Sequence, residues 1–470
     1  MTVSQDQVTE WCTQLINKSP DFASLEECIE SIPNLDSIAE CPAGTRVLVR
    51  GDTDVVVSDT GTIEEDVRLR SLVETLKFGC EHNWVQLVYG HRGRDPKLSL
   101  EPVAGHLKTL LTEAGVENPQ VSFIGEWLND ETGEVLDSAA EAVAAAADGT
   151  IIVLENTRRY EMERVLWKAS ADDLSGIIER VTNYANSVRE KLATIHVNEG
   201  FAASNRDLSS TIVPLTMDHA VLGKYIESEL VNHVTKTRQA ELVIFSGIKI
   251  NKLDDLEQIL NRGSVKMVIA AGSLAMALKK ANANINGEEF EMGLSNDPDE
   301  YIYIPPDRIE QATAMLKQGI ENGVKFVLPL DFIIEDGTAV ESIPPDGALF
   351  DVGPQTIEMQ ADEIGKFIEF SNQKVADGNG PAIVFHNGVF GKFEEEQYAN
   401  GTRMFISQLK RMHDAGVTVY VGGGEGGAAL MRYGNETWVT HCFTAGGTLL
   451  KALGSEPIPY LKALFLKSQQ

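Results

Sequence analysis

The sequence predicts an α/β protein built from two doubly wound, mainly parallel sheets that are joined by an interdomain helix. The 470 residues exceed the size at which one hydrophobic core keeps growing, so two domains are expected. Short apolar runs alternate with longer helical patterns, which is typical of β-α-β units. About five such strands lie on each side of the amphipathic stretch LGKYIESELVNHVTKTR, which we interpret as the interdomain helix.

These patterns divide the chain into segments. Residues 1–43 hold two short helical patterns and form a helical N-terminal extension. Residues 44–218 form the first domain, and residues 219–237 form the interdomain helix. Residues 238–454 form the second domain. The apolar pattern within 455–470 predicts a segment that docks back onto the first domain.

The composition excludes several classes of protein. A hydrophobic content of 43% and a charged content of 23% are those of a globular protein. We expect a cytoplasmic protein without a membrane partner, because no apolar stretch is long enough to span a bilayer and the first residues lack a signal-peptide pattern. The net charge of −30 disfavours nucleic-acid binding. The five cysteines are odd in number and lack metal-site spacing, so we expect reduced thiols.

Charged side chains follow the apolar strands of the first half. These residues are Arg50, Asp52, His91, Arg94, Arg158 and Arg206. Open α/β sheets bind ligands at the carboxyl ends of their strands. Guanidinium groups stay charged and bind carboxylate and phosphate through two hydrogen bonds. The pattern predicts a site for a small phosphorylated acid, although His91 alone would more often be structural and Asp52 is suited either to orient an arginine or to accept a substrate hydroxyl.

Arg68 and Arg70 open a helix after a turn-like segment of the same half. In isolation, such arginines usually pair with nearby acidic residues, here Glu64, Glu65 or Asp66. The other arginines at strand ends favour an additional role in the anion site.

Glycines follow the strands of the second half. The residues after the strand VTVYV are Gly422, Gly423, Gly424, Glu425 and Gly426. Glycine lets the backbone approach a phosphate closely, and the N-terminus of the following helix supplies N–H groups. The run lacks a full dinucleotide or Walker pattern, so a tight strand-to-helix turn remains the alternative. Candidates for the phosphate cation and the Mg²⁺ carboxylate are Lys249, Lys252, Asp351 and Glu425.

Together, these motifs resemble the phosphoglycerate kinase family from about Arg46 onward. The similar segments, in the family's order, are VLVRGDTDV, DVRLR, GHRGRDP, LENTRRY, VNEGFAASNR, FSGIKINK, LPLDFIIED, DVGPQT, HNGVFGKFE, GGGEGGAA and THCFTAGG. Each short motif is weak alone, but the set in register is specific.

The resemblance implies two Rossmann-like domains with hinge closure. The domain of residues 44–218 would bind 3-phosphoglycerate, and the domain of residues 238–454 would bind the magnesium nucleotide. The implied reaction is a glycolytic phosphoryl transfer between 1,3-bisphosphoglycerate and ADP, giving 3-phosphoglycerate and ATP, and it requires Mg²⁺.

The resemblance also implies a role for each matching residue. The substrate set is Asp52, Asp54, Arg68, His91, Arg94, Arg158 and Arg206. The nucleotide set is Lys249, Gly272, Asn387, Glu394, Gly422, Gly423, Gly424, Glu425 and Gly426. The catalytic set is Arg68, Lys249, Lys252 and Gly424, with Glu425 as the Mg²⁺ ligand. Arg68 would also stabilise charge on the transferring phosphoryl group.

The chain departs from the family pattern at several of these positions. Lys249 and Lys252 are three positions apart, whereas the family's lysine pair is four apart. Glu425 replaces an aspartate, Asp54 replaces an asparagine and Asn205 replaces a histidine. The alternative to an active kinase is therefore a catalytically impaired relative that acts as a binding or structural subunit. We expect a monomer that binds small-molecule ligands. Residues 1–43 could in addition bind a protein partner.

Overall fold

The computed structural model describes residues 2–17, 23–203, 205–454 and 458–470. The chain forms two compact units: unit 1 is Met1–Asn232 with Glu456–Gln470, and unit 2 is His233–Ser455. Parts of the expected N-terminal extension and of the docking segment, at 1, 18–22 and 455–457, lie outside the described residues. Within those described ranges, no helix combines the length and hydropathy needed to cross a bilayer.

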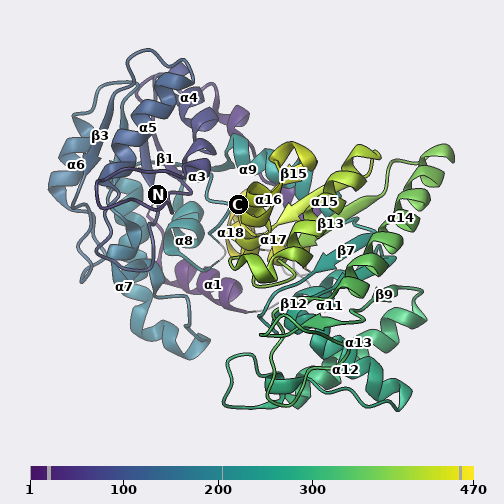
Figure 1. Ribbon diagram of the computed structural model, residues 1–470. Helices are drawn as coiled ribbons and strands as arrows, with labels where there is room; N and C mark the ends of the chain where they lie inside the picture. Colours follow the sequence, from purple (N-terminus) through teal and green to yellow (C-terminus); the bar gives the residue numbers. More distant parts are fainter. Residues whose placement is uncertain (1, 18–22, 204, 455–457) are drawn as a thin grey trace. The chain divides into compact units, whose positions relative to one another are not determined.

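Unit 1 contains one parallel sheet of six strands in the order β3-β4-β2-β1-β5-β6. Figure 1 shows β1 and β3 of this sheet among the helices α4, α5 and α6. Its strands are β1 (Arg46–Arg50), β2 (Val85–Tyr89), β3 (Val121–Ile124), β4 (Ile151–Leu154), β5 (Ile195–Asn198) and β6 (His219–Leu222). Its α-helices are α1 (Gln5–Ile16), α2 (Leu25–Ser31), α3 (Val67–Arg70), α4 (Val73–Glu81), α5 (Glu101–Glu113), α6 (Asp137–Ala144), α7 (Leu174–Lys191), α8 (Leu208–Thr216), α9 (Lys224–Ser228) and α18 (Pro459–Ser468). The strands are rich in Val, Ile and Leu because helices cover both faces of the sheet.

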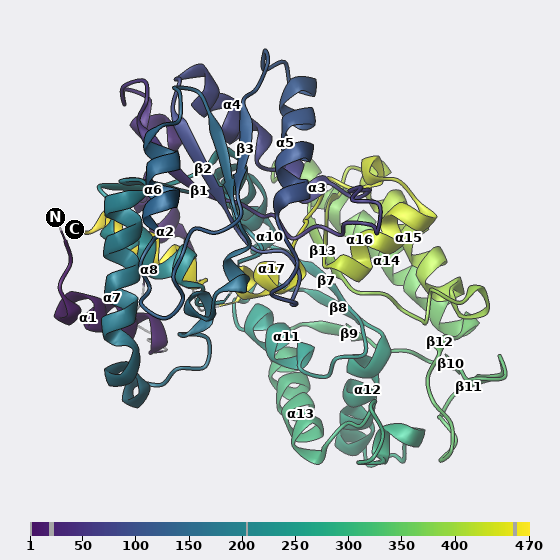
Figure 2. The ribbon, with the colours of Figure 1, turned by 90° about the vertical axis from the view of Figure 1, so that its left-hand side faces the viewer.

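Each face of this sheet has its own hydrophobic core. On one face, Leu48 and Leu87 pack with α1, α6, α7 and α8. On the other face, Val49 and Val88 pack with α4 and α5. Figure 2 shows α7 and α8 on one side of the strands and α5 on the other. The alternation of side chains along each strand therefore fills two separate layers.

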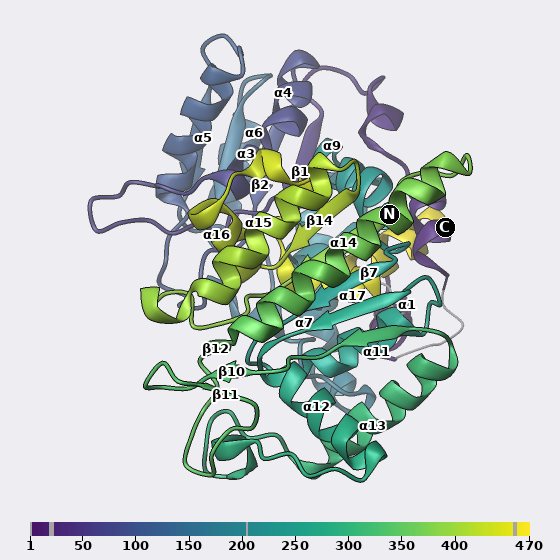
Figure 3. The same cartoon turned by 45° about the vertical axis from the view of Figure 1, so that its right-hand side comes forward.

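Unit 2 also contains a parallel sheet of six strands, in the order β15-β14-β13-β7-β8-β9, and a small antiparallel sheet in the order β11-β10-β12. Its strands are β7 (Leu242–Phe245), β8 (Met267–Ala270), β9 (Lys325–Val327), β10 (Phe332–Ile333), β11 (Ala339–Val340), β12 (Asp351–Val352), β13 (Ile383–Asn387), β14 (Thr418–Gly422) and β15 (His441–Cys442). Its α-helices are α10 (Thr235–Thr237), α11 (Lys252–Leu260), α12 (Gly272–Asn286), α13 (Pro306–Glu321), α14 (Pro354–Ala376), α15 (Asn400–Asp414), α16 (Gly424–Tyr433) and α17 (Gly446–Leu453). Figure 3 shows α14 and α15 over one face of this larger sheet, where they share a core with β7 and β13.

In each large sheet, the chain adds strands first toward one edge and then toward the other. In unit 1 the chain adds strands on one side of β1 and then returns to add β5 and β6 on its other side. In unit 2 the same reversal occurs between β7 and β13. Ligands of open α/β sheets bind at the carboxyl ends of the strands beside such a reversal.

The described structure corrects two details of the expected organisation. Each large sheet has six strands, where we expected about five. Residues 219–222, expected at the start of the interdomain helix, instead form β6 beside β5. Ala220, Val221 and Leu222 are all buried, and such a three-residue apolar run suits a strand that is covered on both faces. Helical structure then begins with α9 and continues through a π-helical segment, Glu229–Val234, into α10.

The N-terminal helices belong to the core of unit 1. Ser4 and Ser24 each form a capping box at the start of α1 and α2. Val8 and Cys12 on α1 are fully buried against α7 and α8. Helix α18 packs against α8 and α2, and its Tyr460 and Leu464 are fully buried.

Candidate functional site

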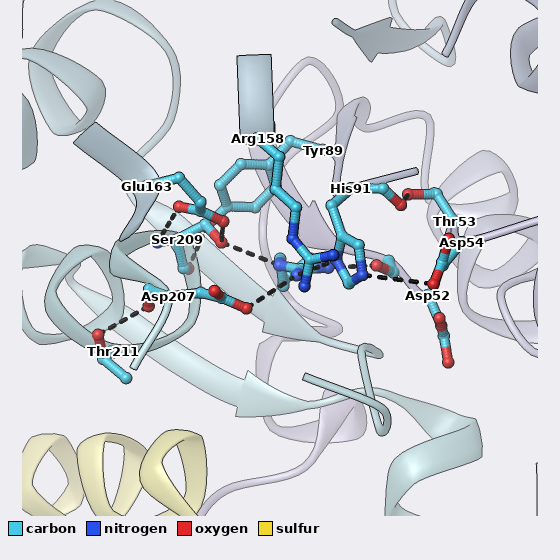
Figure 4. Close-up of polar contacts among 12 residues, drawn as sticks. Asp52, Thr53, Asp54, Tyr89, His91, Arg158, Glu163, Asp207, Ser209 and Thr211 are labelled. Atoms are coloured by element: carbon cyan, nitrogen blue, oxygen red, sulfur yellow. Dashed lines mark hydrogen bonds and ion pairs between the residues drawn. The ribbon is translucent and has the colours of Figure 1, made fainter. Parts of the chain in front are cut away.

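The carboxyl ends of β1, β2, β4 and β5 bring a group of charged side chains together in unit 1 (Figure 4). At its centre lies Arg50, the last residue of β1, which is only 1% exposed. Its Nε donates to Ser209 Oγ at 2.9 Å, and its Nη2 lies 3.6 Å from Asp207 Oδ2. The same Nη2 lies 3.3 Å from His91 Nδ1. A buried guanidinium requires such partners, because an uncompensated buried charge is costly.

The buried carboxyl of Glu163 supports Arg50 indirectly, through Ser209 of α8. Glu163 accepts a hydrogen bond from the backbone N–H of Ser209 at 3.0 Å and another from its hydroxyl at 2.5 Å. Burial, with the charge of Asp207, raises the pKa of Glu163 to about 7. Glu163 and Asp207 were not among the predicted residues, and Arg50 belonged to the strand-end pattern but not to the substrate set. Arg50 gave a signal, a charged residue closing an apolar strand, but no motif distinguishes Glu163 from an ordinary surface glutamate.

Asp54 joins two of the predicted substrate residues. Its Oδ2 lies 3.1 Å from Arg68 Nη1 and 3.6 Å from His91 Nε2, and its Oδ1 accepts from the Gly93 N–H at 2.7 Å. Burial acts to raise the pKa of Asp54, but the nearby His91 and the hydrogen bond from Gly93 hold this pKa below its ordinary value. Burial lowers the pKa of His91 despite the nearby carboxylate of Asp54. Asp54 is therefore an anion between two groups that were predicted to bind an anionic substrate.

Asp52 and Arg94 occupy opposite environments. Asp52 is only 3% exposed, and its Oδ1 lies 3.8 Å from Arg68 Nη1. Burial raises the pKa of Asp52, and Arg68 partly opposes the shift. Arg94 is exposed and makes no hydrogen bond or ion pair that the structure records among the described residues. Its guanidinium is therefore available to an anion from solution.

Arg158 and Arg206 lie around Trp167. The Arg158 Nη1 donates to the carbonyl of Gly93 at 2.9 Å, and its Cζ lies 5.1 Å from the centroid of the Trp167 ring. Arg206 Nη2 donates to the Trp167 carbonyl at 2.7 Å. Burial lowers the pKa of both arginines. Both guanidinium groups donate to backbone carbonyls, and the carboxylate of Asp207 partly opposes the effect of burial on the pKa of Arg158.

Arg68 and Arg70 separate into two roles. Arg70 pairs with Asp66 at 2.8 Å and with Glu113 at 3.3 Å, as an isolated surface arginine would. Arg68 instead contacts Asp52 and Asp54 at the strand ends.

In unit 2, glycines crowd the ends of β7, β13 and β14. A Cβ atom added to Gly272 would lie 2.6 Å from the carbonyl oxygen of Gly247, and one added to Gly388 would lie 2.1 Å from the carbonyl oxygen of Ser246. Gly423 has a φ of +94°, and Asn387 Nδ2 donates to the carbonyl of Gly422 at 3.0 Å. Backbones therefore approach each other more closely here than any side chain would allow.

Lys252 reaches into this glycine cluster from the start of α11. Its ammonium donates to the carbonyl of Ser246 at 2.5 Å and lies beside Gly247 and Gly388. Burial lowers the pKa of Lys252, and the carboxylate of Glu425 partly opposes this shift. Lys249, by contrast, is exposed. Of the two predicted lysines, Lys252 is the one that the fold directs toward the strand ends of unit 2.

The other residues predicted to act in unit 2 differ in their exposure. Gly424 begins α16 with open space beside it, and Glu425 in the first turn is exposed. Glu394 is exposed after β13. Asp351 is buried and accepts backbone N–H groups of Val352 and Gly401, each at 2.8 Å, and burial raises its pKa to about 7. Asp351 thus has a structural environment, whereas Glu425 presents a carboxylate to solvent.

Comparisons with known sequences and with solved structures all point to one family. The family model described as phosphoglycerate kinase matches residues 39–456. A phosphoglycerate kinase of Clostridium beijerinckii is 30% identical over 435 residues, covering 90% of this chain and 96% of the relative. One of Fervidobacterium nodosum is 28% identical over 446 residues, covering 91% and 97%. The solved phosphoglycerate kinase structure from Coxiella burnetii has a TM-score of 0.69 at 22% identity, covering 93% of this chain and 100% of that one.

Proposed function

Because this chain belongs to the phosphoglycerate kinase family, we propose that it transfers a phosphoryl group reversibly between 1,3-bisphosphoglycerate and ADP, giving 3-phosphoglycerate and ATP in glycolysis. The observation that carries this proposal is the convergence of arginines and a histidine on the strand ends of unit 1. Arg68 and Arg158 lie there with the imidazole of His91, whose pKa is lowered by burial, and the exposed Arg94 adds a further cation. Such a group suits a small molecule that carries both a carboxylate and a phosphate.

The substrate set acts by positioning and by electrostatics. Arg94, Arg158 and Arg206 offer guanidinium groups to the carboxylate and phosphate, and Asp52 offers an acceptor to the hydroxyl. Arg68 supplies positive charge for the transferring group, because phosphoryl transfer needs stabilisation of charge more than covalent chemistry. We assign Arg50 no contact with the ligand, because it is buried and its Nη2 instead contacts His91.

The glycine cluster of unit 2 is suited to nucleotide phosphates. The backbone N–H groups at Gly424 and Gly426 open α16, and a helix N-terminus attracts phosphate. Lys252 supplies a cation beside them, while Gly272, Asn387, Glu394 and Lys249 complete the set carried over from the family. The exposed carboxylate of Glu425 fits Mg²⁺, a hard cation that takes one or two protein carboxylates with water and phosphate oxygens. Bound there, Mg²⁺ would neutralise charge on the phosphates.

A coupled assay with 3-phosphoglycerate and ATP, with and without a chelator of Mg²⁺, tests the reaction. The lysine variants Lys252→Ala and Lys249→Ala then form a matched pair, because both remove one ammonium within the same loop and helix start. We expect Lys252→Ala to lower kcat by about a hundredfold or more, as for loss of one electrostatic contact to the transition state. Lys249→Ala should lower kcat by a smaller factor. Equal turnover in Lys252→Ala and the unaltered protein would remove Lys252 from the mechanism.

The competing function is a binding or structural subunit without turnover. Folded protein that turns over neither in the ATP-forming nor in the ATP-consuming direction would establish it. One structural observation weakens it: the apolar face of α1 is buried within unit 1, so this face is occupied rather than presented to a partner.

We place the protein in the cytoplasm as a monomer. A relative from Triticum aestivum, 28% identical over 439 residues, is named a cytosolic phosphoglycerate kinase. Sedimentation of the purified chain and microscopy of a tagged copy test these two assignments.

A further inference from the structure

Trp167 contacts three of the charged groups at the anion site, yet it belongs to no predicted set. It lies in the segment between two short 3-10 helices, Glu161–Arg164 and Ala171–Asp173. Its ring faces the Arg158 guanidinium at 5.1 Å, and its indole Nε1 donates to Asp207 Oδ1 at 2.6 Å. Its backbone carbonyl accepts from Arg206 Nη2 at 2.7 Å.

Arg158 depends on this ring for its orientation. Besides the hydrogen bond from Nη1 to the Gly93 carbonyl, the described residues provide no hydrogen-bond partner for its buried Nε. A guanidinium stacked on an aromatic face keeps its N–H edge free for a ligand. The ring thus packs against the Arg158 guanidinium without accepting any of its N–H groups.

The indole N–H of Trp167 also acts on the buried Arg50, through Asp207. Asp207 accepts from Trp167 through Oδ1, while its Oδ2 lies 3.6 Å from Arg50 Nη2. Arg50 in turn lies 3.3 Å from His91. The indole therefore fixes the carboxylate that opposes Arg50, and Arg50 fixes the imidazole.

We propose that Trp167 is a positioning residue of the anion site, which sets the orientation of Arg158 by its ring face and that of Asp207 by its indole N–H. The ligand class is a small phosphorylated anion. The identification of that anion as phosphoglycerate rests on the proposed function, but the positioning role does not.

Two substitutions separate the two contacts. Trp167→Phe keeps an aromatic face for Arg158 and removes the N–H bond to Asp207, whereas Trp167→Leu removes both. The contact of Arg206 with the backbone carbonyl survives in each variant. Trp438 in unit 2 provides the matched control, because it is half-buried and also carries a cation, Lys410, over its ring at 5.8 Å.

The first measurement is the affinity of the full-length protein for inorganic phosphate and for 3-phosphoglycerate by calorimetry. We expect Trp167→Leu to weaken both affinities about tenfold and Trp167→Phe about threefold, from loss of a cation–π contact and of one hydrogen bond. In steady-state assays the KM for 3-phosphoglycerate should rise with a much smaller change in kcat. Trp438→Phe and Trp438→Leu should leave both affinities unchanged.

The second measurement is tryptophan fluorescence during phosphate titration. Binding at Arg158 should change the emission of the unaltered protein and of Trp438→Phe, and this change should be lost in Trp167→Phe. Unaltered affinity and an unaltered emission response in Trp167→Phe would overturn the proposal even if Trp167→Leu does not fold. Phosphate binding with the expected variant effects but without turnover would overturn the kinase assignment and leave this positioning role standing.

Discussion

Asp54 neutralises part of the positive charge that the anion site offers. Its carboxylate lies 3.1 Å from Arg68 and 3.6 Å from His91, and its pKa is held below the ordinary range. An incoming phosphate or carboxylate must share these two groups with a charge that is already in place. Because Asp54 is one-third exposed, solvent weakens this competition without removing it.

We expect Asp54→Asn to bind 3-phosphoglycerate several-fold more tightly, because Arg68 and His91 lose an internal anion while the amide oxygen can still accept from Gly93. Calorimetry at two salt concentrations measures the effect. Asp59→Asn is the control, since Asp59 is exposed in the same segment and its loss changes the net charge equally. An affinity that rises as much in Asp59→Asn would attribute the gain to long-range charge alone.

At this scale the sequence located the charged residues at strand ends but not the groups that orient them. Arg68, His91 and Arg158 follow or lie near apolar strands, so the strand-end rule of parallel sheets brings them together. Glu163 and Trp167 lie in short helices and turns after β4, where neither hydrophobic periodicity nor spacing predicts which way a side chain points. Their roles depend on tertiary contacts with Asp207 and Ser209, which come from a distant part of the chain.

Among the elements, α9 begins on a buried carboxylate. Glu199, just after β5, accepts from the backbone N–H groups of Tyr225 at 3.2 Å and Ile226 at 3.0 Å, and from the hydroxyl of Thr75. It thereby ties the end of β5 to the start of α9 and to α4. Burial raises the pKa of Glu199 to about 7, against hydrogen bonds that lower it.

This carboxyl makes stability depend on pH. Its pKa in the folded state exceeds its ordinary value of 4.5, so the folded chain binds more protons than the unfolded chain between about pH 4.5 and 7. Its contribution is complete below pH 4.5 and is lost as pH rises through 7. We expect the thermal midpoint to fall between pH 5 and 8, and to fall less in Glu199→Gln. Equal slopes in the two proteins would show that Glu199 titrates normally.

Strands and helices were predictable where a single hydrophobic pattern was clear. The continuous apolar runs of β1 and β2 are examples. The segment 219–222 was not, because HAVL directly precedes an amphipathic helix and joins its apolar pattern without a break. This segment is a strand because it pairs with β5 in the folded sheet, and nothing in its own sequence predicts that pairing.

On the scale of the whole molecule, unit 1 is assembled from two separate parts of the chain. Helix α18 returns to unit 1 after the whole of unit 2 and packs against α8 and α2. Its Leu461, Ala463 and Leu464 are fully buried, so unit 1 includes them in its core.

We expect Leu464→Ala to lower the free energy of unfolding of the full chain by about 2–5 kcal/mol, through lost burial and a cavity. Denaturant titration monitored by circular dichroism measures the loss. Leu466→Ala, two residues later and half-buried, should cost clearly less. Similar losses at both positions would show that α18 contributes little through its buried face.

The late position of α18 has a consequence for biosynthesis. Residues 233–455 are translated between α9 and α18. Ribosomes add roughly 5–20 residues per second, so α8 waits on the order of ten seconds or more for the helix that covers it. During that interval the nascent chain presents an incomplete first unit to chaperones and proteases. Unit 2, whose residues are contiguous, is translated in full before the unit that was begun first.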